Sequence, residues 1–276
     1  VVEIDLWSEV ARVKCYDFEY DNVRLSDLGF IICQFDSSDV ETVSNGSEIK
    51  FETVSTLNGI KHELTSAIYE DCLTATFQIC KHPCDYDETE VSVEDMRKIM
   101  RWLNRKEYHK FKLLDDEYSG IYLEASFNVS KVEIDGRIRG FELEMFTNRP
   151  FALQEPVLIA LDIVEANEVK TIYSASDEEG YIYPNMEITI SVNGVLEIYN
   201  ASEDRTMRVN NCKKGEVITV EYPMISSSLP SHKIQNDFNW QFFRISSTFK
   251  DKENNVTVSL PCSIKMEYSP IAKIGI

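Results

Sequence analysis

Cysteine and histidine residues are most closely spaced along the sequence in the segment Cys80-Lys81-His82-Pro83-Cys84, and Cys72 precedes this segment by eight residues. Thiolate sulfur and imidazole nitrogen are the usual ligands of structural zinc. A convincing zinc site has a second pair of ligands at similar short spacing, and the sequence contains no such pair. We therefore predict no metal site, and we interpret the segment as a loop between a strand and a helix.

Adjacent carboxylates occur at Asp115-Asp116 and at Glu178-Glu179. A glycosidase needs two carboxyl groups flanking one bond, and neighbouring residues of a strand point to opposite faces, so adjacency does not predict that pair. The sequence also lacks a glycine-rich phosphate loop and a Gly-x-Ser-x-Gly nucleophile motif. We predict no catalytic residue, no bound cofactor and no enzymatic activity.

Three aromatic residues, Phe238, Trp240 and Phe242, recur at a spacing of two. In a strand they would share one face, which is either the inside of a sandwich or a platform that stacks on a sugar ring. We favour the core for the set, because large aromatic side chains are mostly buried. Trp240 remains the candidate carbohydrate platform.

The net charge of −19, from 47 acidic and 28 basic residues, argues against tight binding of nucleic acid. The charge is still compatible with DNA that passes along an acidic surface of the protein, because electrostatic repulsion would prevent the DNA from binding to it. No apolar run is long enough to span a bilayer, and no signal peptide is recognisable. The seven scattered cysteines favour reduced thiols and synthesis in the cytoplasm.

One helix stands out in a chain that otherwise alternates like a β protein. Ser92 and Asp95 form a capping-box pattern, and the helix is predicted over about residues 93–105. Its apolar stripe, which must lie on a sheet, consists of Val93, Met96, Ile99, Met100 and Leu103. Trp102 lies off this stripe, so it covers the end of the helix or meets another subunit.

Alternating segments and turn signals predict strands on both sides of the helix. Asp135-Gly136 predicts a tight hairpin, with a bulge near Ser130 and Lys131, and Asn193-Gly194 predicts a second hairpin. The alternation stops after residues 148–150, and we place a domain boundary at about residues 152–157. The prediction is a β domain with one helix over 1–153 and a β-sandwich over 157–276.

Particular sequence segments resemble the distal tail protein family of long-tailed (siphovirus-type) phages and prophages of Gram-positive bacteria. In the first half they are residues 18–29, 102–108 and 140–151. In the second half they are residues 178–184, 211–216, 232–238 and 268–270. The segments are not catalytic signatures, and their order along nearly the whole chain is what carries the resemblance.

The resemblance implies a structural protein of the virion tail tip. It implies an N-terminal tail-tube-like β-barrel or sandwich that assembles as a hexameric ring, followed by a C-terminal sandwich similar to galectins or carbohydrate-binding modules. The implied partners are other copies of the chain, the tail tube protein and the tail-associated fibre or lysin protein. Further implied partners are a receptor-binding protein and cell-wall polysaccharide, with DNA only in passage and no membrane.

Three residues are candidates for the subunit interface: Asn58, Gly59 and Trp102. The first two lie in the turn-rich region 45–64, which we expect to project toward a neighbour as an arm or hairpin. The alternative function is a monomeric carbohydrate-binding module for cell-surface polysaccharide. Residues 271–276 either finish the sandwich or return to the first domain.

Overall fold

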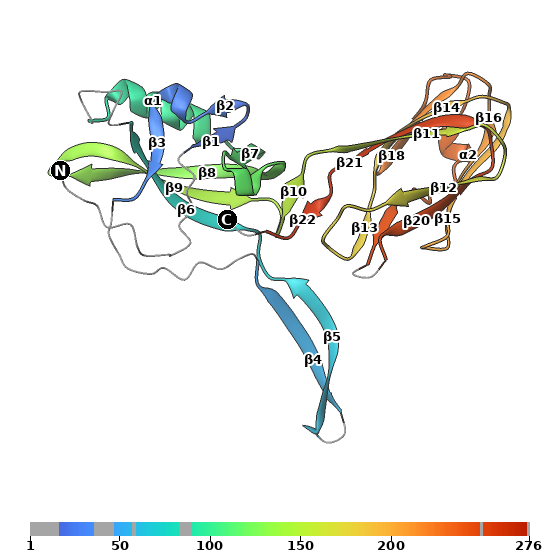
Figure 1. Ribbon diagram of the computed structural model, residues 1–276, viewed down its shortest axis with the longest axis horizontal. Helices are drawn as coiled ribbons and strands as arrows, with labels where there is room; N and C mark the ends of the chain where they lie inside the picture. The colour runs from blue at the N-terminus through green and yellow to red at the C-terminus, as the bar shows by residue number, and fades with distance from the viewer. Residues whose placement is uncertain (1–16, 36–46, 57–58, 83–89, 249–250, 275–276) are drawn as a thin grey trace. The chain divides into compact units, whose positions relative to one another are not determined.

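The computed structural model describes residues 17–35, 47–56, 59–82, 90–248 and 251–274 (Figure 1). These residues fall into two compact units, of which the first ends at Phe151 and the second runs from Ala152 to Ile274. Large apolar side chains are buried in each unit. Within the described ranges, no helix is long and apolar enough to cross a membrane.

The first unit combines an antiparallel sheet, a separate two-stranded hairpin and a helix. Its strands and helices are β1 (Phe18–Tyr20), β2 (Val23–Arg24), the 3-10 turn Ser26–Leu28, β3 (Phe30–Cys33), β4 (Ile49–Thr56), β5 (Lys61–Tyr69), β6 (Thr74–Lys81), α1 (Val93–Leu103), β7 (His109–Leu113), the 3-10 turn Asp116–Tyr118, β8 (Ile121–Ile134) and β9 (Arg137–Thr147). The sheet orders its strands β2-β1-β7-β8-β9-β6-β3.

Helix α1 begins at the capping box that the sequence predicts. Ser92 Oγ accepts a hydrogen bond from the Asp95 backbone N–H at 3.1 Å, and Asp95 Oδ2 accepts one from the Ser92 N–H at 3.1 Å. Ile99 and Leu103 are buried, and α1 packs on β8. Val93 and Met100 are exposed, so the predicted five-residue contact stripe is wrong at these two positions. The helix is buried along a narrower strip than its apolar residues predict.

The hairpin of β8 and β9 turns at Asp135-Gly136, as predicted. Both residues have positive φ, 53° and 74°, which is the geometry of a type I′ turn. The bulge is not at Ser130 and Lys131, because the register shifts between Val132 and Glu133 and leaves an extra residue on β9. Gly140 lies beside this irregularity and a Cβ there would lie 2.1 Å from the Ile79 carbonyl oxygen. A glycine within a strand often marks such a bulge.

An aromatic cluster fills the core of the first unit. It gathers side chains from β1, β6, β7 and β8, with ring centroids 5.1–6.3 Å apart, namely Phe18, Tyr20, Phe77, Phe111 and Phe127. Most of these contacts are edge-on or tilted, which is the favoured arrangement for aromatic rings. The cluster therefore fixes the strands of this sheet against α1.

The second unit consists almost wholly of short strands. They are β10 (Ala152–Gln154), β11 (Val157–Ile163), β12 (Glu168–Tyr173), β13 (Gly180–Ile182), β14 (Asn185–Ile190), β15 (Gly194–Asn200), β16 (Arg205–Cys212), β17 (Val217–Glu221), β18 (Met224–Ser227), the short helix α2 (Ile234–Asp237), β19 (Ile245–Ser247), β20 (Glu253–Val258), β21 (Cys262–Tyr268) and β22 (Ile271–Ala272).

Two sheets of this unit share one core and so form a β-sandwich. One sheet is ordered β11-β21-β14-β17-β18 and the other β12-β20-β15-β16. Ile188 and Ile264 of the first sheet and Leu196 and Val256 of the second belong to a single buried cluster. The prediction of a mainly β chain, with one helix in the first domain and a β-sandwich in the second, is confirmed.

Asn193-Gly194 does not form the hairpin that the sequence predicts. The strand before it, β14, pairs with β17 and β21, whereas the strand after it, β15, pairs with β16 and β20 in the other sheet. The chain therefore crosses from one sheet to the other at this point. A Cβ on Gly194 would lie 2.6 Å from Leu260 Cδ1, so the glycine allows the Leu260 side chain to pack closely against the backbone here.

The first and last strands of the second unit pair with each other. In β10 and β22, Ala152 lies opposite Ala272 and Leu153 opposite Ile271. Residues 275–276 lie outside the described residues, so the placement of the C-terminal end remains a prediction.

Candidate functional site

A groove of about 510 Å³ runs between α1 and the sheet of the first unit. Its lining is apolar with three cationic side chains, and it consists of Met96, Arg97, Met100, Arg101, Val129, Lys131 and Phe141. None of these residues is a carboxylate, histidine, serine or cysteine, so the groove has no group for acid-base or nucleophilic chemistry. An apolar floor with a charged edge is the pattern of a surface that docks another polypeptide.

The hairpin of β4 and β5 presents an unusual amount of apolar surface. Its strands pair with each other as a separate two-stranded sheet. Phe51 is 63% exposed, and Ile49, Val54, Leu64 and Ile68 are also exposed. An isolated two-stranded hairpin is at best marginally stable in water. A surface of this kind is therefore suited to contact with another chain.

Gly59 lies at the tip of this hairpin with φ of +89°, which glycine adopts without strain. Its neighbour Ile60 is 86% exposed. Asn58, the other predicted interface residue of this turn, lies outside the described residues. A contact between this tip and a neighbouring subunit stays a prediction.

Trp102 lies against the aromatic core of the first unit. Its indole Nε1 donates a hydrogen bond to the Tyr20 carbonyl oxygen at 3.0 Å, and its ring stacks on Phe18 with centroids 5.5 Å apart. The side chain is only partly buried. Trp102 thus packs on β1, and its role in a subunit interface stays a prediction.

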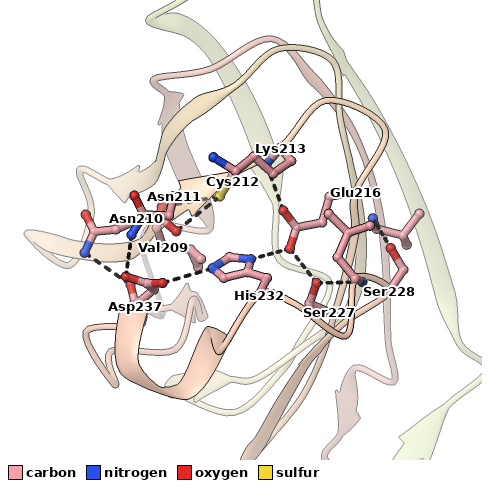
Figure 2. A network of polar contacts seen from close by, with 12 residues as sticks. Val209, Asn210, Asn211, Cys212, Lys213, Glu216, Ser227, Ser228, His232 and Asp237 are labelled. Carbon is pink, nitrogen blue, oxygen red and sulfur yellow. Dashed lines mark hydrogen bonds and ion pairs between the residues drawn. The ribbon is translucent and has the colours of Figure 1, made fainter.

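The second unit contains a buried polar network around His232 (Figure 2). His232 Nδ1 lies 2.5 Å from Glu216 Oε1, and its Nε2 lies 3.3 Å from Asp237 Oδ2. The exposed fraction is 5% for the His232 side chain and 0% for that of Glu216. Glu216 also accepts hydrogen bonds from Ser227 Oγ at 2.5 Å and from the Lys213 N–H at 2.8 Å.

This network can hold the fold but is poorly arranged for catalysis. Ser227 Oγ directs its hydrogen bond to Glu216, and Cys212 Sγ directs one to the Val209 carbonyl oxygen. Neither possible nucleophile is therefore bonded to the imidazole, as a catalytic triad requires. Burial alone would raise the pKa of Glu216, but the hydrogen bonds from Ser227, His232 and Lys213 outweigh it and lower that pKa.

The network joins three segments that are distant along the chain. Glu216 immediately precedes β17 and Ser227 ends β18. His232 lies just before α2, and Asp237 is the last residue of that helix. Nothing in the sequence indicated this arrangement, because the residues do not form a motif and the histidine is isolated among the four of the chain. The network fastens α2 to the edge of the sandwich.

Residues 238–242 do not form the strand expected from their alternation. Phe238 makes an isolated bridge with Val209, and Phe238 and Phe242 are buried, as predicted for a core. Trp240 is instead 57% exposed and has φ of +59°. The left-handed backbone at Trp240 turns its side chain outward between the two buried rings, a feature that spacing alone could not predict.

The cysteine motif does not lead to a metal site in the part of the chain that the structure describes. No cluster of three or more metal-ligating side chains occurs there. Cys80 and Cys33 lie on the paired strands β6 and β3, where Cys80 is opposite Ile31, and the hydrogen bond between the two thiols together with burial raises the pKa of Cys33. Cys84 lies outside the described residues.

Comparison with known proteins matches both units to phage tail proteins. The sequence family described as "Phage tail protein N-terminal domain" matches residues 13–149, and the family described as "Phage tail C-terminal domain" matches residues 151–268. No curated protein matches the sequence. The crystal structure of SPP1 Dit (gp 19.1), described as a paradigm of hub adsorption apparatus in Gram-positive infecting phages, is similar in fold. It has a TM-score of 0.62 at 11% sequence identity, over 93% of this chain and 99% of that chain.

Proposed function

The chain belongs to the phage tail protein family, and from this premise we propose that it forms a hexameric ring at the distal end of the tail tube. The observation that carries the proposal is the likeness of fold to SPP1 Dit, which extends over both units. In this role the protein is structural rather than enzymatic, and it resides at the virion tail tip of a phage or prophage of Gram-positive bacteria. It would be synthesised in the host cytoplasm.

The proposed ring joins the tail tube protein on one side to the fibre or lysin protein on the other. A receptor-binding protein is a further partner in this proposal. Cyclic closure suits the first unit, because a ring pairs or covers exposed strand edges between neighbours without leaving an open end. The exposed apolar hairpin of β4 and β5 is the surface that we propose to cover a neighbouring subunit, with Gly59 at its tip. Asn58, which lies outside the described residues, is the other interface residue of this proposal.

The net charge of −19 gives the proposed ring a second property. If acidic side chains line the lumen, the DNA that passes through is repelled by the wall and does not adhere. A neutral or positive potential measured in the lumen of an assembled ring would contradict this part of the proposal.

The ring is tested with the full chain by light scattering over a concentration series and by negative-stain microscopy. We expect six-fold rings at high concentration, or on co-expression with the tube and fibre proteins. Monomers under all of these conditions would contradict the proposal.

The matched variants Phe51→Asp and Leu158→Asp separate the hairpin from other exposed surfaces. Each places a carboxylate at an exposed apolar position of a strand, in β4 and in β11 respectively. We expect Phe51→Asp to prevent ring formation and Leu158→Asp to leave it intact. Equal effects of both variants would remove the hairpin from the interface.

The second candidate function is that of a monomeric carbohydrate-binding module, which the exposed Trp240 favours. It predicts a signal on a glycan array and monomers at every concentration. A ring without saccharide binding excludes it.

A further inference from the structure

We propose that an acidic and apolar segment of this same chain, residues 1–10, docks into the groove beside α1 and covers its floor. The groove of a free chain is then closed to other polypeptides. The inference concerns the first unit alone and does not depend on the proposed ring. Residues 1–16 lie outside the described residues. The form and charge of the groove, the composition of the segment and the short chain between the two support the docking.

The floor of the groove continues the face of the sheet that carries the aromatic core. Val129 follows the buried Phe127 by two residues on β8, and Lys131 follows Val129 by two, so the three side chains share one face of the strand. Phe141 of β9 lies opposite Lys131 on the same face. Helix α1 therefore leaves an apolar part of this face open at the groove.

Helix α1 lines the groove with two adjacent rows of side chains. Met96 and Met100 are four residues apart and form an apolar row. Arg97 and Arg101 each follow one of these methionines and form a cationic row beside it. Met100 is exposed and Met96 is only partly buried. An occupant of the groove therefore meets apolar and cationic groups side by side.

The groove gathers positive charge on an acidic protein. Arg97, Arg101 and Lys131 are exposed, and none of them forms an ion pair with a carboxylate of the described residues. Lys98, the next cation of the helix, does have a partner, Glu94 Oε1 at 3.3 Å. In a chain with a net charge of −19, three cations without partners around an apolar floor favour an acidic occupant.

Residues 1–10 have the complementary composition. They contain three acids and no base, and the acids are Glu3, Asp5 and Glu9. Six of the other seven residues are apolar, namely Val1, Val2, Ile4, Leu6, Trp7 and Val10. The number of carboxylates equals the number of cations around the groove. The segment can therefore cover the floor and neutralise the three cations together.

The spacing of the acids in the segment also matches the spacing of the arginines in α1. Asp5 and Glu9 are four residues apart, as are Arg97 and Arg101. An apolar residue follows each of these acids, just as a methionine precedes each arginine. Residues four apart on a helix are separated by about 6 Å along its axis. A helical segment would thus present two carboxylates at the interval of the two guanidinium groups.

The chain between the segment and β1 is long enough for docking within one molecule. The ring of Phe18, which begins β1, stacks on Trp102 at 5.5 Å and lies 6.3 Å from the ring of Phe127. Trp102 follows Arg101 directly, and Phe127 lies on the face of β8 that continues into the groove. Seven residues separate Val10 from Phe18. They reach up to about 25 Å when extended, and a short linker gives a high effective concentration.

The test places a photoreactive side chain in the segment of the full chain, as Trp7→p-benzoylphenylalanine. Unlabelled chains and isotopically labelled chains are mixed in equal amounts and irradiated, and mass spectrometry identifies the crosslinked peptides. We expect crosslinks to the part of α1 that contains Met96 and Met100, or to the strands that contain Val129 and Phe141, within single chains. Crosslinks that join a labelled to an unlabelled chain, crosslinks only to other segments, or no crosslinks would each overturn the proposal.

A charge exchange tests how the groove recognises the segment. One exposed ion pair changes an equilibrium by a factor of about 1.5 to 5, so Arg97→Glu/Arg101→Glu should lower the crosslink yield about three- to tenfold. Adding Asp5→Lys/Glu9→Lys to this chain should restore the yield. Lys98→Glu is the matched control, because Lys98 is an exposed cation of the same helix outside the groove.

Lys98→Glu should keep the crosslink yield of the wild type, and circular dichroism should show that every variant is folded. An equal loss in this control, or no recovery after the charge exchange, would overturn the proposal. Ring assembly by a chain without these crosslinks would overturn it while leaving the proposed function intact.

Discussion

Replacement of Glu216 by alanine should be among the most destabilising single changes in the second unit. The carboxylate is fully buried and accepts hydrogen bonds from three donors, the Lys213 N–H, Ser227 Oγ and His232 Nδ1. Alanine leaves all three donors without their acceptor in a site that water does not reach. An unsatisfied buried donor is penalised, because it gave up its bonds to water on folding.

The expected magnitude follows from this arrangement. Removing one partner of a buried ion pair costs about 3–5 kcal/mol in the free energy of unfolding. The three bonds share one carboxylate, so their individual contributions do not add, and we expect Glu216→Ala to fall within that range. Glu216→Gln should lose about 1–3 kcal/mol, because its amide NH₂ must face one of the donors.

The assay is urea unfolding followed by tryptophan fluorescence. The two units can unfold in separate transitions, so a Trp240→Phe chain identifies the transition that belongs to the second unit. Glu187→Ala is the control, because Glu187 forms an exposed pair with Lys265 in the same unit. That pair should contribute less than about 1 kcal/mol.

The double variant Glu216→Ala/His232→Ala tests whether the two residues act together. In a double-mutant cycle, residues in contact show a coupling of about 0.5–3 kcal/mol. A loss below about 1 kcal/mol in Glu216→Ala, or a coupling of zero with His232, would refute the view that this network fastens α2 to the sandwich.

Three further predictions concern stability. Trp102→Ala removes the stacking on Phe18 and should destabilise the first unit by about 1–3 kcal/mol in urea unfolding, whereas an unchanged midpoint would contradict a stabilising contact between this ring and the aromatic cluster. Gly140→Ala should destabilise the same unit strongly, since the added Cβ would lie 2.1 Å from the Ile79 carbonyl oxygen, and circular dichroism on heating measures the loss. Because the pKa of Glu216 is lowered in the folded chain, its charged form stabilises the fold at pH values above the ordinary carboxyl pKa of about 4.3. This contribution should be lost as the pH falls below that value, whereas the stability of Glu216→Gln should lack this pH dependence.

Local chemistry was predictable from the sequence wherever a few adjacent residues decide it. The capping box of Ser92 and Asp95 and the type I′ turn at Asp135-Gly136 both depend on contacts within four residues, and both are confirmed. The pairing of strands that are distant in the sequence was not predictable in this way. Asn193-Gly194 has the composition of a hairpin turn, yet the partner strands of β14 and β15 lie elsewhere in the sequence and draw them into different sheets.

On the candidate functional surfaces, too, some features could be predicted from adjacent residues and others depend on contacts between distant parts of the chain. Alternation predicted that Phe238 and Phe242 are buried, but the positive φ that exposes Trp240 depends on bonds between Asn239 and β16. The basic edge of the groove beside α1 combines arginines of the helix with Lys131 of β8, and only the folded chain brings these together. The arm expected from the turn-rich region 45–64 corresponds to the hairpin of β4 and β5, but the exposure of its apolar side chains became known only from the structure.

The pairing of β10 with β22 has a consequence for the inheritance of this protein. The polypeptide enters and leaves the sandwich at adjacent points, as Ala152 lies opposite Ala272. Domains with neighbouring ends tolerate excision, permutation and insertion into a host chain. Recombination between phage genomes can therefore exchange the sandwich as a cassette through two nearby junctions. Such exchange would give related phages different sandwich domains on an unchanged first domain.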